Sequence, residues 1–362
     1  MDVEFSVLNP SGYPRTGHAT VRWSNPPAEF QKNPDRISLF SLDDAVARRH
    51  PLPVQLEPAG SSNRPESLLS FTLPAGAPIQ PGESARLLLA ETDASFRVER
   101  YTHSPLAAPA PSVDLYNDRL FITQSLEPSH GPGSAGCFGG AAQSVRLRDL
   151  EFLEQFALSL AGHDPEKRCM QIDVLRIWHP QSTSPVEHPV FSNRWELVST
   201  CAGPVRTTCT IALRLPSGPD AAGIRFTRAL SLFMDEDYIL DESSIAGGAS
   251  DGLAFSPRYF ANMDMGLWPD VFRAQPTWLS IGFSSVRRPG YGFAAQVPVQ
   301  SFCNPHPGYP GWVSSAIRTF SWEIQRCSQL KCLHVFMHGG DVRDRTGRLW
   351  HEQIEAPLSA TF

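Results

Sequence analysis

The feature that constrains the fold most is a series of extended segments between Asn193 and Ile245. After a Gly203-Pro204 turn, apolar and polar positions alternate as far as Arg214, which is the two-residue period of a half-buried β-strand. One face carries Val205, Thr207, Cys209, Ile211 and Leu213, and the other carries Arg206, Thr208, Thr210, Ala212 and Arg214.

Two more extended segments follow this strand. The first, IRFTRALSLFM, comes after a Pro- and Gly-rich break, and the second, DYILDESSI, comes after the acidic turn at 235–237. Three long strands joined by turns form an antiparallel meander, which buries one face only when a second sheet packs against it. We therefore predict a β-sandwich in which the following meander residues are buried: Val205, Cys209, Ile211, Phe226, Leu230, Leu232 and Ile239.

Turn-forming residues recur along the whole chain. The 33 prolines and 26 glycines interrupt it every dozen residues or so, which favours short strands over long helices and predicts an all-β protein. One short helix is predicted over Arg146–Gly162, where leucines and other apolar residues recur at spacings of three and four and a glycine ends the pattern.

Length and linker composition predict two domains. A chain of 362 residues is long enough for two domains of roughly 150 residues or more. The Pro-, Ala- and Ser-rich segment Thr102–Ser112 cannot build a core, so we expect it to be a linker. The predicted domains are a small β-sandwich over 1–105 and a larger β-sandwich over 113–362.

Composition and charge exclude several classes of partner. Hydrophobic residues make up 41% and charged residues 19%, which is ordinary for a globular protein. The formal net charge of −6 and the lack of a basic run argue against a nucleic-acid partner. No transmembrane segment or signal-peptide core is visible, so we expect no membrane partner and a cytoplasmic protein, or a secreted one where a leader has been removed.

No metal or cofactor is expected from the sequence. The seven cysteines are odd in number and form no C-x-x-C pair, which argues against a disulfide framework and a zinc knuckle. His334 and His338 would share one face of a strand about 13 Å apart, at ~3.3 Å per residue, and this is too far to bind one ion. The acidic run Asp235–Glu242 lacks the glycine spacing of a calcium loop and is expected to be a solvated turn.

Two stretches resemble known carbohydrate-active proteins. A strand that begins GPVR, at 203–206, followed by a strand that ends in a DEDY turn, at 235–238, resembles the β-sandwich domains of the galactose-mutarotase-like superfamily. The N-terminal order N-P-S-G-x-P-R, P-V-Q, S-x-L-S-F-x-L-P and P-G-E-S is similar to the first sandwich of exo-rhamnogalacturonan-lyase-like proteins, although Pro65-Glu66 stands where Asp-Gly is expected. The resemblance implies a C-terminal super-sandwich and action on a glycan or another small-molecule substrate.

Four clusters of polar and aromatic residues are candidates for a sugar site. Such a site needs flat apolar rings and directional hydrogen-bonding groups. The two richest clusters run from Arg258 to Asp270 and from Asn304 to Trp312; the others lie around Trp178, His188 and Trp195, and around His334, His338 and Asp341. The alternative is that these aromatic residues only cap the open ends of a sandwich.

The chemistry that these residues favour most is β-elimination on a uronate-containing glycan. It needs a cation to neutralise the carboxylate, a base to take the C5 proton and an acid to protonate the leaving oxygen. The predicted catalytic residues are His306, Tyr259, Arg258 and His188, and the predicted substrate-binding residues are Arg194, Asn262, Asp264, Trp268 and Trp312. We expect them to line one pocket.

Three other functions fit the same residues. A hydrolase would use two carboxylates, for which Asp264 and Asp270 are candidates. A non-catalytic sugar-binding protein would use the aromatic rings alone. An isomerase or cyclase would use a sandwich cavity as a shaped vessel for a small molecule, and the fold does not decide among these functions.

Overall fold

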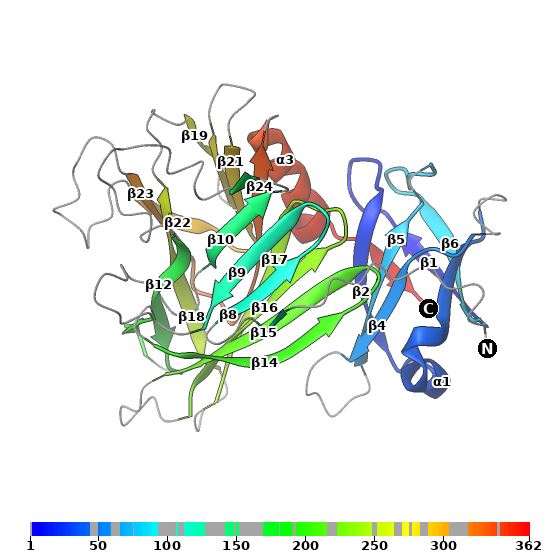
Figure 1. The fold of residues 1–362 in the computed structure, drawn as a ribbon, viewed down its shortest axis with the longest axis horizontal. Helices are drawn as coiled ribbons and strands as arrows, with labels where there is room; N and C mark the ends of the chain where they lie inside the picture. The colour runs from blue at the N-terminus through cyan, green and yellow to red at the C-terminus, as the bar shows by residue number, and fades with distance from the viewer. Residues whose placement is uncertain are drawn as a thin grey trace. The chain divides into compact units, whose positions relative to one another are not determined.

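The computed structural model describes most of the chain. The described residues are 2–43, 50–58, 66–74, 76–92, 106–107, 112–126, 142–147, 150–151, 169–180, 182–190, 193–215, 223–247, 252–263, 270–274, 277–282, 289–303, 318–338 and 341–362. They form antiparallel β-sheets with a few short helices, so the all-β prediction is confirmed (Figure 1). No helix in this described part is long and apolar enough to cross a membrane.

The chain divides into two compact units. Unit 1 consists of residues 1–103, 202–207 and 351–362, and unit 2 consists of residues 104–201 and 208–350. Leu106–Ala107, inside the expected linker, forms strand β7 and pairs with strand β8 of unit 2. The remainder of that segment lies almost wholly outside the described residues, so the domain boundary stays a prediction.

Unit 1 contains a four-stranded and a three-stranded sheet. In spatial order, the first contains β25 (Ser359–Thr361), β1 (Asp2–Leu8), β6 (Ser84–Glu91) and β3 (Ile37–Ser41), and the second contains β2 (Gly17–Ser24), β5 (Glu66–Leu73) and β4 (Val54–Pro58). The helical segments are α1 (Ala28–Lys32), η1 (Pro34–Arg36) and the π-helix η5 (His351–Glu355).

The core of unit 1 includes residues from distant parts of the chain. Phe5 and Trp23 are buried there, and the ring of Phe362 stacks on both, with centroid separations of 5.0 and 4.5 Å. Arg206 is also buried in this unit, where its Nη2 donates to Glu57 Oε2 at 3.0 Å. The C-terminal strand and a segment from the middle of the chain therefore complete the N-terminal unit.

Unit 2 contains the two large sheets. The ten-stranded sheet follows the path β22 (Val299–Cys303), β23 (Arg318–Ile324), β18 (Ala254–Met263), β12 (Cys169–Trp178), β10 (Ala142–Leu147), β9 (Leu120–Ser125), β8 (Ser112–Tyr116) and β7, with β11 (Leu150–Glu151) and β13 (Val186–Pro189) beside β10 and β12. The eight-stranded sheet contains β14 (Trp195–Ala202), β15 (Arg206–Arg214), β16 (Arg225–Phe233), β17 (Tyr238–Ala246), β24 (Gln329–His338), β21 (Pro289–Ala295), β20 (Trp278–Gly282) and β19 (Asp270–Ala274).

The two large sheets share one apolar core. Phe255 of β18 packs against Phe226 of β16 at 5.3 Å between ring centroids, and Tyr259 of β18 packs against Phe293 of β21 at 5.1 Å. The predicted meander is present as β15, β16 and β17, which pair in sequence order. All seven meander residues that we predicted to be buried are between 0 and 7% exposed, so that prediction is confirmed.

A helix packs on the eight-stranded sheet through glycines. Helix α3 (Val342–Trp350) lies against β20, β21 and β24. A Cβ atom added to Gly292 would lie 1.8 Å from Thr346 Oγ1, and one added to Gly290 would lie 2.8 Å from Val342 Cβ. The absence of side chains at these two positions lets the helix approach the sheet.

The helix predicted from Arg146 is not formed at its start. Residues Arg146 and Leu147 belong to β10, and Leu150 and Glu151 form β11, while 152–162 lie outside the described residues. Polar Ser144 and Arg146 alternate with apolar Val145 and Leu147, and this two-residue period of a paired strand prevails over the helical spacing of the leucines.

Candidate functional site

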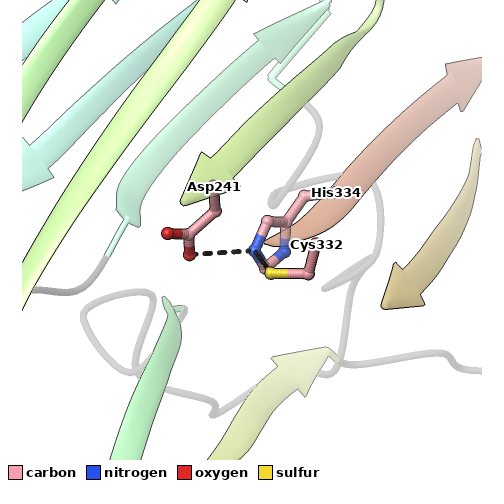
Figure 2. Close-up of side chains that lie close together, drawn as sticks. All are labelled: Asp241, Cys332 and His334. Carbon is pink, nitrogen blue, oxygen red and sulfur yellow. Dashed lines mark hydrogen bonds and ion pairs between the residues drawn. The ribbon is translucent and has the colours of Figure 1, made fainter. Parts of the chain in front are cut away.

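A buried group of three metal-binding residue types lies on the inner face of the eight-stranded sheet. Asp241 of β17 is the direct partner of Cys332 of β24, and His334 lies two residues further along β24 on the same face. All three side chains are buried, and Figure 2 shows the carboxylate, thiol and imidazole directed toward one another. We call these three residues the Asp-Cys-His cluster.

The distances within the cluster are longer than those of good hydrogen bonds. His334 Nε2 lies 3.6 Å from Asp241 Oδ2 and 3.9 Å from Cys332 Sγ. All three potential ligand atoms lie within 4.8 Å of one another. A nitrogen–oxygen separation of 3.6 Å is too long for a normal hydrogen bond, so the imidazole of His334 and the carboxylate of Asp241 lie close together without a direct hydrogen bond.

Arg228 holds the carboxylate of the cluster in its charged form. Its Nε and Nη2 donate to Asp241 Oδ2 at 3.1 and 2.6 Å, and Ser243 Oγ donates to Oδ1 at 3.0 Å. Burial alone would raise the pKa of Asp241, but the guanidinium outweighs burial and holds that pKa well below its ordinary value. Asp241 is therefore an ionised carboxylate inside an apolar core.

Two tyrosines complete the polar centre. Tyr259, from the ten-stranded sheet, places its hydroxyl 3.5 Å from Asp241 Oδ2 and 3.4 Å from Cys332 Sγ. The hydroxyl of Tyr291 is hydrogen-bonded to His334 Nδ1 at 2.8 Å. Burial raises the pKa of the Cys332 thiol and lowers the pKa of His334, so the cluster combines a thiol, a neutral imidazole and a carboxylate.

Aromatic rings surround this centre. Trp322 stacks on Tyr259 with a centroid separation of 5.7 Å, and Phe293 and Phe336 pack against the neighbouring rings. The indole nitrogen of Trp322 is buried and has no hydrogen-bond partner among the described residues. The cluster is thus enclosed by the sandwich core, where it can hold a small ion but cannot contact a polymeric glycan.

The structure separates two residues that we predicted to act in one pocket. Tyr259 is 2% exposed and points into the core with Ile172, its partner on β12. Arg258 precedes it in β18, so its side chain leaves the opposite face of the sheet. The phenol of Tyr259 is instead brought together with Asp241 and Cys332.

The other described candidates lie elsewhere on unit 2. His188 of β13 is the partner of Leu175, is buried, and has no hydrogen-bond partner for Nε2 among the described residues. Burial, and then the nearby His179, lower the pKa of His188. Arg194 is exposed just before β14. The side chain of Asn262 and the residues Asp264, Trp268, His306 and Trp312 lie outside the part of the chain that can be described, so their common pocket stays a prediction.

Three strand ends next to the undescribed parts of the two richest clusters lie at the same end of the ten-stranded sheet. Met263, the last residue of β18, is the partner of Arg318, the first residue of β23. Cys303, the last residue of β22, is the partner of Ser321 three positions further along β23. The described strands that precede 264–269 and 304–317 in the sequence, β18 and β22, therefore end at the same end of the ten-stranded sheet, and the next described strand after β18 is β19 of the opposite sheet.

Sequence reasoning missed the Asp-Cys-His cluster. The acidic run was expected to be a solvated turn, but β17 begins at Tyr238, and Asp241 is 0% exposed. The available signal was Cys332-Leu333-His334, because alternate residues of a strand share one face. Its aspartate partner is 91 residues away, and only the pairing of β17 with β24 brings it close.

Comparisons with known proteins bear on the fold. No protein-family model matches the chain, and no curated protein sequence matches it. Among solved structures, an α-mannosidase from Enterococcus faecalis V583 is similar over 99% of this chain and 46% of its own, with a TM-score of 0.51 and 11% identity.

A second solved structure, described as a protein in glycosyl hydrolase family 38 from Enterococcus faecalis, is similar over 99% of this chain and 47% of its own, with a TM-score of 0.53 and 10% identity. The chain thus spans about half the length of each. Neither likeness bears on the rhamnogalacturonan-lyase-like resemblance, which stays a prediction. At these identities the likeness shows the fold alone: this chain shares an all-β architecture with part of each of these two structures.

Proposed function

We propose that the protein is carbohydrate-active and that its reaction is hydrolysis of a glycosidic bond. The observation that carries the proposal is the likeness of 99% of the chain to two structures whose descriptions name an α-mannosidase and a glycosyl hydrolase family. The clustering of Trp, Asp, Asn and His in 258–270 and 304–312 supports a glycan as the substrate.

The position of Tyr259 favours hydrolysis over the β-elimination predicted from the sequence. Elimination assigned Tyr259 as a proton donor or acceptor for the glycan. Its phenol faces Asp241 and Cys332 inside the core, and burial raises its pKa well above the ordinary value, which makes proton transfer to a surface-bound glycan unfavourable. Hydrolysis needs two carboxylates, and Asp264 and Asp270 remain candidates.

The proposed glycan site lies at the end of the ten-stranded sheet where β18 and β22 end and β23 begins. Strands β18 and β22 end there, and the segments that follow them in the sequence, 264–269 and 304–317, carry Asp264, Trp268, His306 and Trp312. The tryptophans would cover the apolar face of a sugar ring, and the carboxylate and imidazole would contact its hydroxyl groups.

The test is to incubate the full chain with aryl glycosides, including α-mannosides, and with uronate-containing polysaccharides. Hydrolysis releases aryl alcohol or new reducing ends without an absorbance of unsaturated sugar, and this is the expected result. An unsaturated product would restore the elimination hypothesis. Absence of both products and of any glycan binding would refute a carbohydrate-active protein.

Variants assign the site. Asp264→Asn and His306→Ala are expected to lower turnover by about 100-fold or more, as loss of a general acid or base does. Asp344→Asn, which changes an exposed carboxylate on α3, is the matched control and should retain activity. Equal activity of all three variants would place the site elsewhere.

A second candidate function is glycan binding without catalysis. It is favoured because the described polar centre of unit 2 is enclosed in the core, with its ionisable groups engaged with one another. In that case Trp268→Ala should weaken glycan binding measured by calorimetry, while the wild-type chain forms no product from any substrate in the panel.

A further inference from the structure

We propose that Asp241, Cys332 and His334 bind one zinc ion inside the sandwich core. The inference is independent of the proposed glycan chemistry, because the cluster lies among buried aromatic rings rather than at the end of the sandwich. It rests on the spacing of the three donor atoms, on the strands that hold them and on the groups that orient them.

The spacing fits a zinc ion better than it fits hydrogen bonds. Zinc lies about 2.3 Å from thiolate sulfur and about 2.0–2.2 Å from imidazole nitrogen and carboxylate oxygen, so neighbouring ligand atoms of a tetrahedral site are about 3.3–3.6 Å apart. The separations are 3.6 Å between His334 Nε2 and Asp241 Oδ2 and 3.9 Å between His334 Nε2 and Cys332 Sγ, and the third pair, Asp241 and Cys332, lies within 4.8 Å. The two His334 separations need to contract by a few tenths of an ångström to match a tetrahedral zinc site.

Regular β-structure fixes the three donors in advance. Asp241 and Cys332 are directly opposite each other on β17 and β24, and His334 follows on the same face. Both strands lie inside the eight-stranded sheet, with neighbours on each side. Little conformational entropy would therefore be lost on binding, because the sheet already orders the backbone of every ligand.

Each donor is also oriented by a second group. With zinc on Nε2, the Nδ1–H of His334 donates to the Tyr291 hydroxyl oxygen, 2.8 Å away, so that the Nε2 lone pair faces the other two donors. Arg228 and Ser243 fix the carboxylate of Asp241. The Tyr259 hydroxyl lies 3.4 Å from Cys332 Sγ and 3.5 Å from Asp241 Oδ2, so its oxygen is the candidate for a fourth ligand.

The choice of zinc follows from the chemistry of the donors. A thiolate with an imidazole and a carboxylate suits zinc, whereas magnesium and calcium prefer oxygen donors alone. Binding replaces the proton of the Cys332 thiol, which is released to solvent, so the thiolate and the Asp241 carboxylate together balance the charge of Zn²⁺. The positive charge of Arg228 then remains on the centre unless Tyr259 also loses its proton.

The competing interpretation is a buried Arg228–Asp241 ion pair with Cys332 and His334 as neutral neighbours. Zinc titration of the full chain against a chromophoric chelator separates the two. We expect one tightly bound zinc per chain, a thiolate-to-metal charge-transfer band when Co²⁺ replaces zinc, and a Tm several degrees higher with zinc than after chelation. Absence of the cobalt band overturns the proposal.

Variants locate the ion. Cys332→Ser and His334→Gln should lower zinc affinity by about 100-fold or more, and Tyr291→Phe should lower it by about 10–100-fold. Cys209→Ser removes another fully buried thiol of the same core and should leave zinc binding unchanged. The zinc-induced change in Tm is compared within each variant, with folding checked by circular dichroism, so a general loss of stability is not mistaken for loss of a ligand. Equal zinc binding by Cys332→Ser and the wild-type chain also overturns the proposal.

Discussion

Two carboxylates of unit 2, the buried Asp241 and the half-buried Glu236, both pair with an arginine, yet their pKa values shift in opposite directions. Asp241 accepts two hydrogen bonds from Arg228 and one from Ser243, and the guanidinium outweighs the cost of burial. Glu236 shares Arg345 with Asp237, at 2.7 and 3.0 Å from the same Nη2 atom. Burial therefore dominates at Glu236, and its pKa is raised.

This difference predicts that Glu236→Gln changes how the free energy of unfolding depends on pH. A carboxyl whose folded-state pKa is raised contributes stability that is complete below the unfolded-state value of ~4.3 and is lost as the pH rises through the folded-state value. The glutamine cannot ionise, and Arg345 keeps Asp237 as its partner. The free energy of unfolding of the variant, relative to that of the wild type, should rise with pH over this interval.

Urea denaturation at a series of pH values measures the effect. Asp344→Asn, an exposed change on α3, serves as the comparison. A wild-type stability that rises rather than falls, relative to Glu236→Gln, as the pH increases above ~4.3 would show that Arg345 outweighs burial.

Ile211→Ala tests the packing of the sandwich at a single residue. Ile211 is 0% exposed in β15, so its truncation leaves a cavity and should cost about 2–5 kcal/mol of unfolding free energy. Thr210→Ala, at a half-buried position next to it, should cost less. A negligible loss for Ile211→Ala in thermal or urea unfolding would contradict the burial of this residue.

At the residue scale, burial in the meander was predictable because two-residue alternation fixes the inward face. Ile211 and Phe226 follow that pattern. Asp241 does not, since a buried charge is acceptable only when a partner such as Arg228 is close. The sequence predicts that Arg228 and Asp241 lie on different strands but does not show that their side chains pair. Alternation alone therefore could not predict the candidate site.

Among the elements, helix α3 packs close to the eight-stranded sheet because the sheet has glycines at the contact. Gly290 and Gly292 lie on β21, under Val342 and Thr346. Gly292→Ala would place a Cβ atom 1.8 Å from Thr346 Oγ1, whose hydroxyl already bonds to the Val342 carbonyl at 2.6 Å. The helix must then move outward, and we expect a destabilisation of about 1–3 kcal/mol, as for other overpacked sites.

Thermal unfolding of Gly292→Ala measures this cost. Gly12→Ala is the matched control, because a Cβ atom there would have no neighbour within 4 Å. If both variants unfold at the wild-type temperature, the contact between α3 and β21 is looser than described.

The sequence predicted strands better than helices at this scale. The leucines after Arg146 recur at helical spacing, yet the start of this segment is extended. Strand β10 pairs with β9, and β11 pairs with β10. The start of α3 had a recognisable signal, since Asp341 Oδ1 accepts hydrogen bonds from the backbone N–H of Arg343 and Asp344. Local pairing and capping, rather than the apolar period alone, decided both segments.

For the whole molecule, the fold class could be predicted from the sequence. Which segments of the chain make up each unit could not. Alternation and frequent turns indicate β-sheets without specifying which distant segments join them. Unit 1 includes 202–207 and 351–362, and Arg206 reaches Glu57 across 149 residues of sequence. Such non-local contacts have no local sequence signal.

Limited proteolysis tests the predicted boundary between the domains. The linker region near 103–113 should be cut first, because its Pro-, Ala- and Ser-rich sequence contributes, among the described residues, only the two-residue strand β7 and the start of β8 to a sheet. Mass spectrometry of the early fragments identifies the site. First cleavage inside β16 or β17 instead would place the most accessible backbone within the meander and contradict the boundary.

The pairing of β25 with β1 has a consequence for the order in which the protein can mature. The first sheet of unit 1 is almost fully synthesised by Glu91, yet its edge strand and Phe362, which stacks on Trp23, are made roughly 270 residues later. At about 5–20 residues per second, translation takes roughly 15–50 s to reach them. Unit 1 is thus completed only after the residues of unit 2 have been made, and a nascent chain must keep Phe5 and Trp23 from other partners until β25 leaves the ribosome.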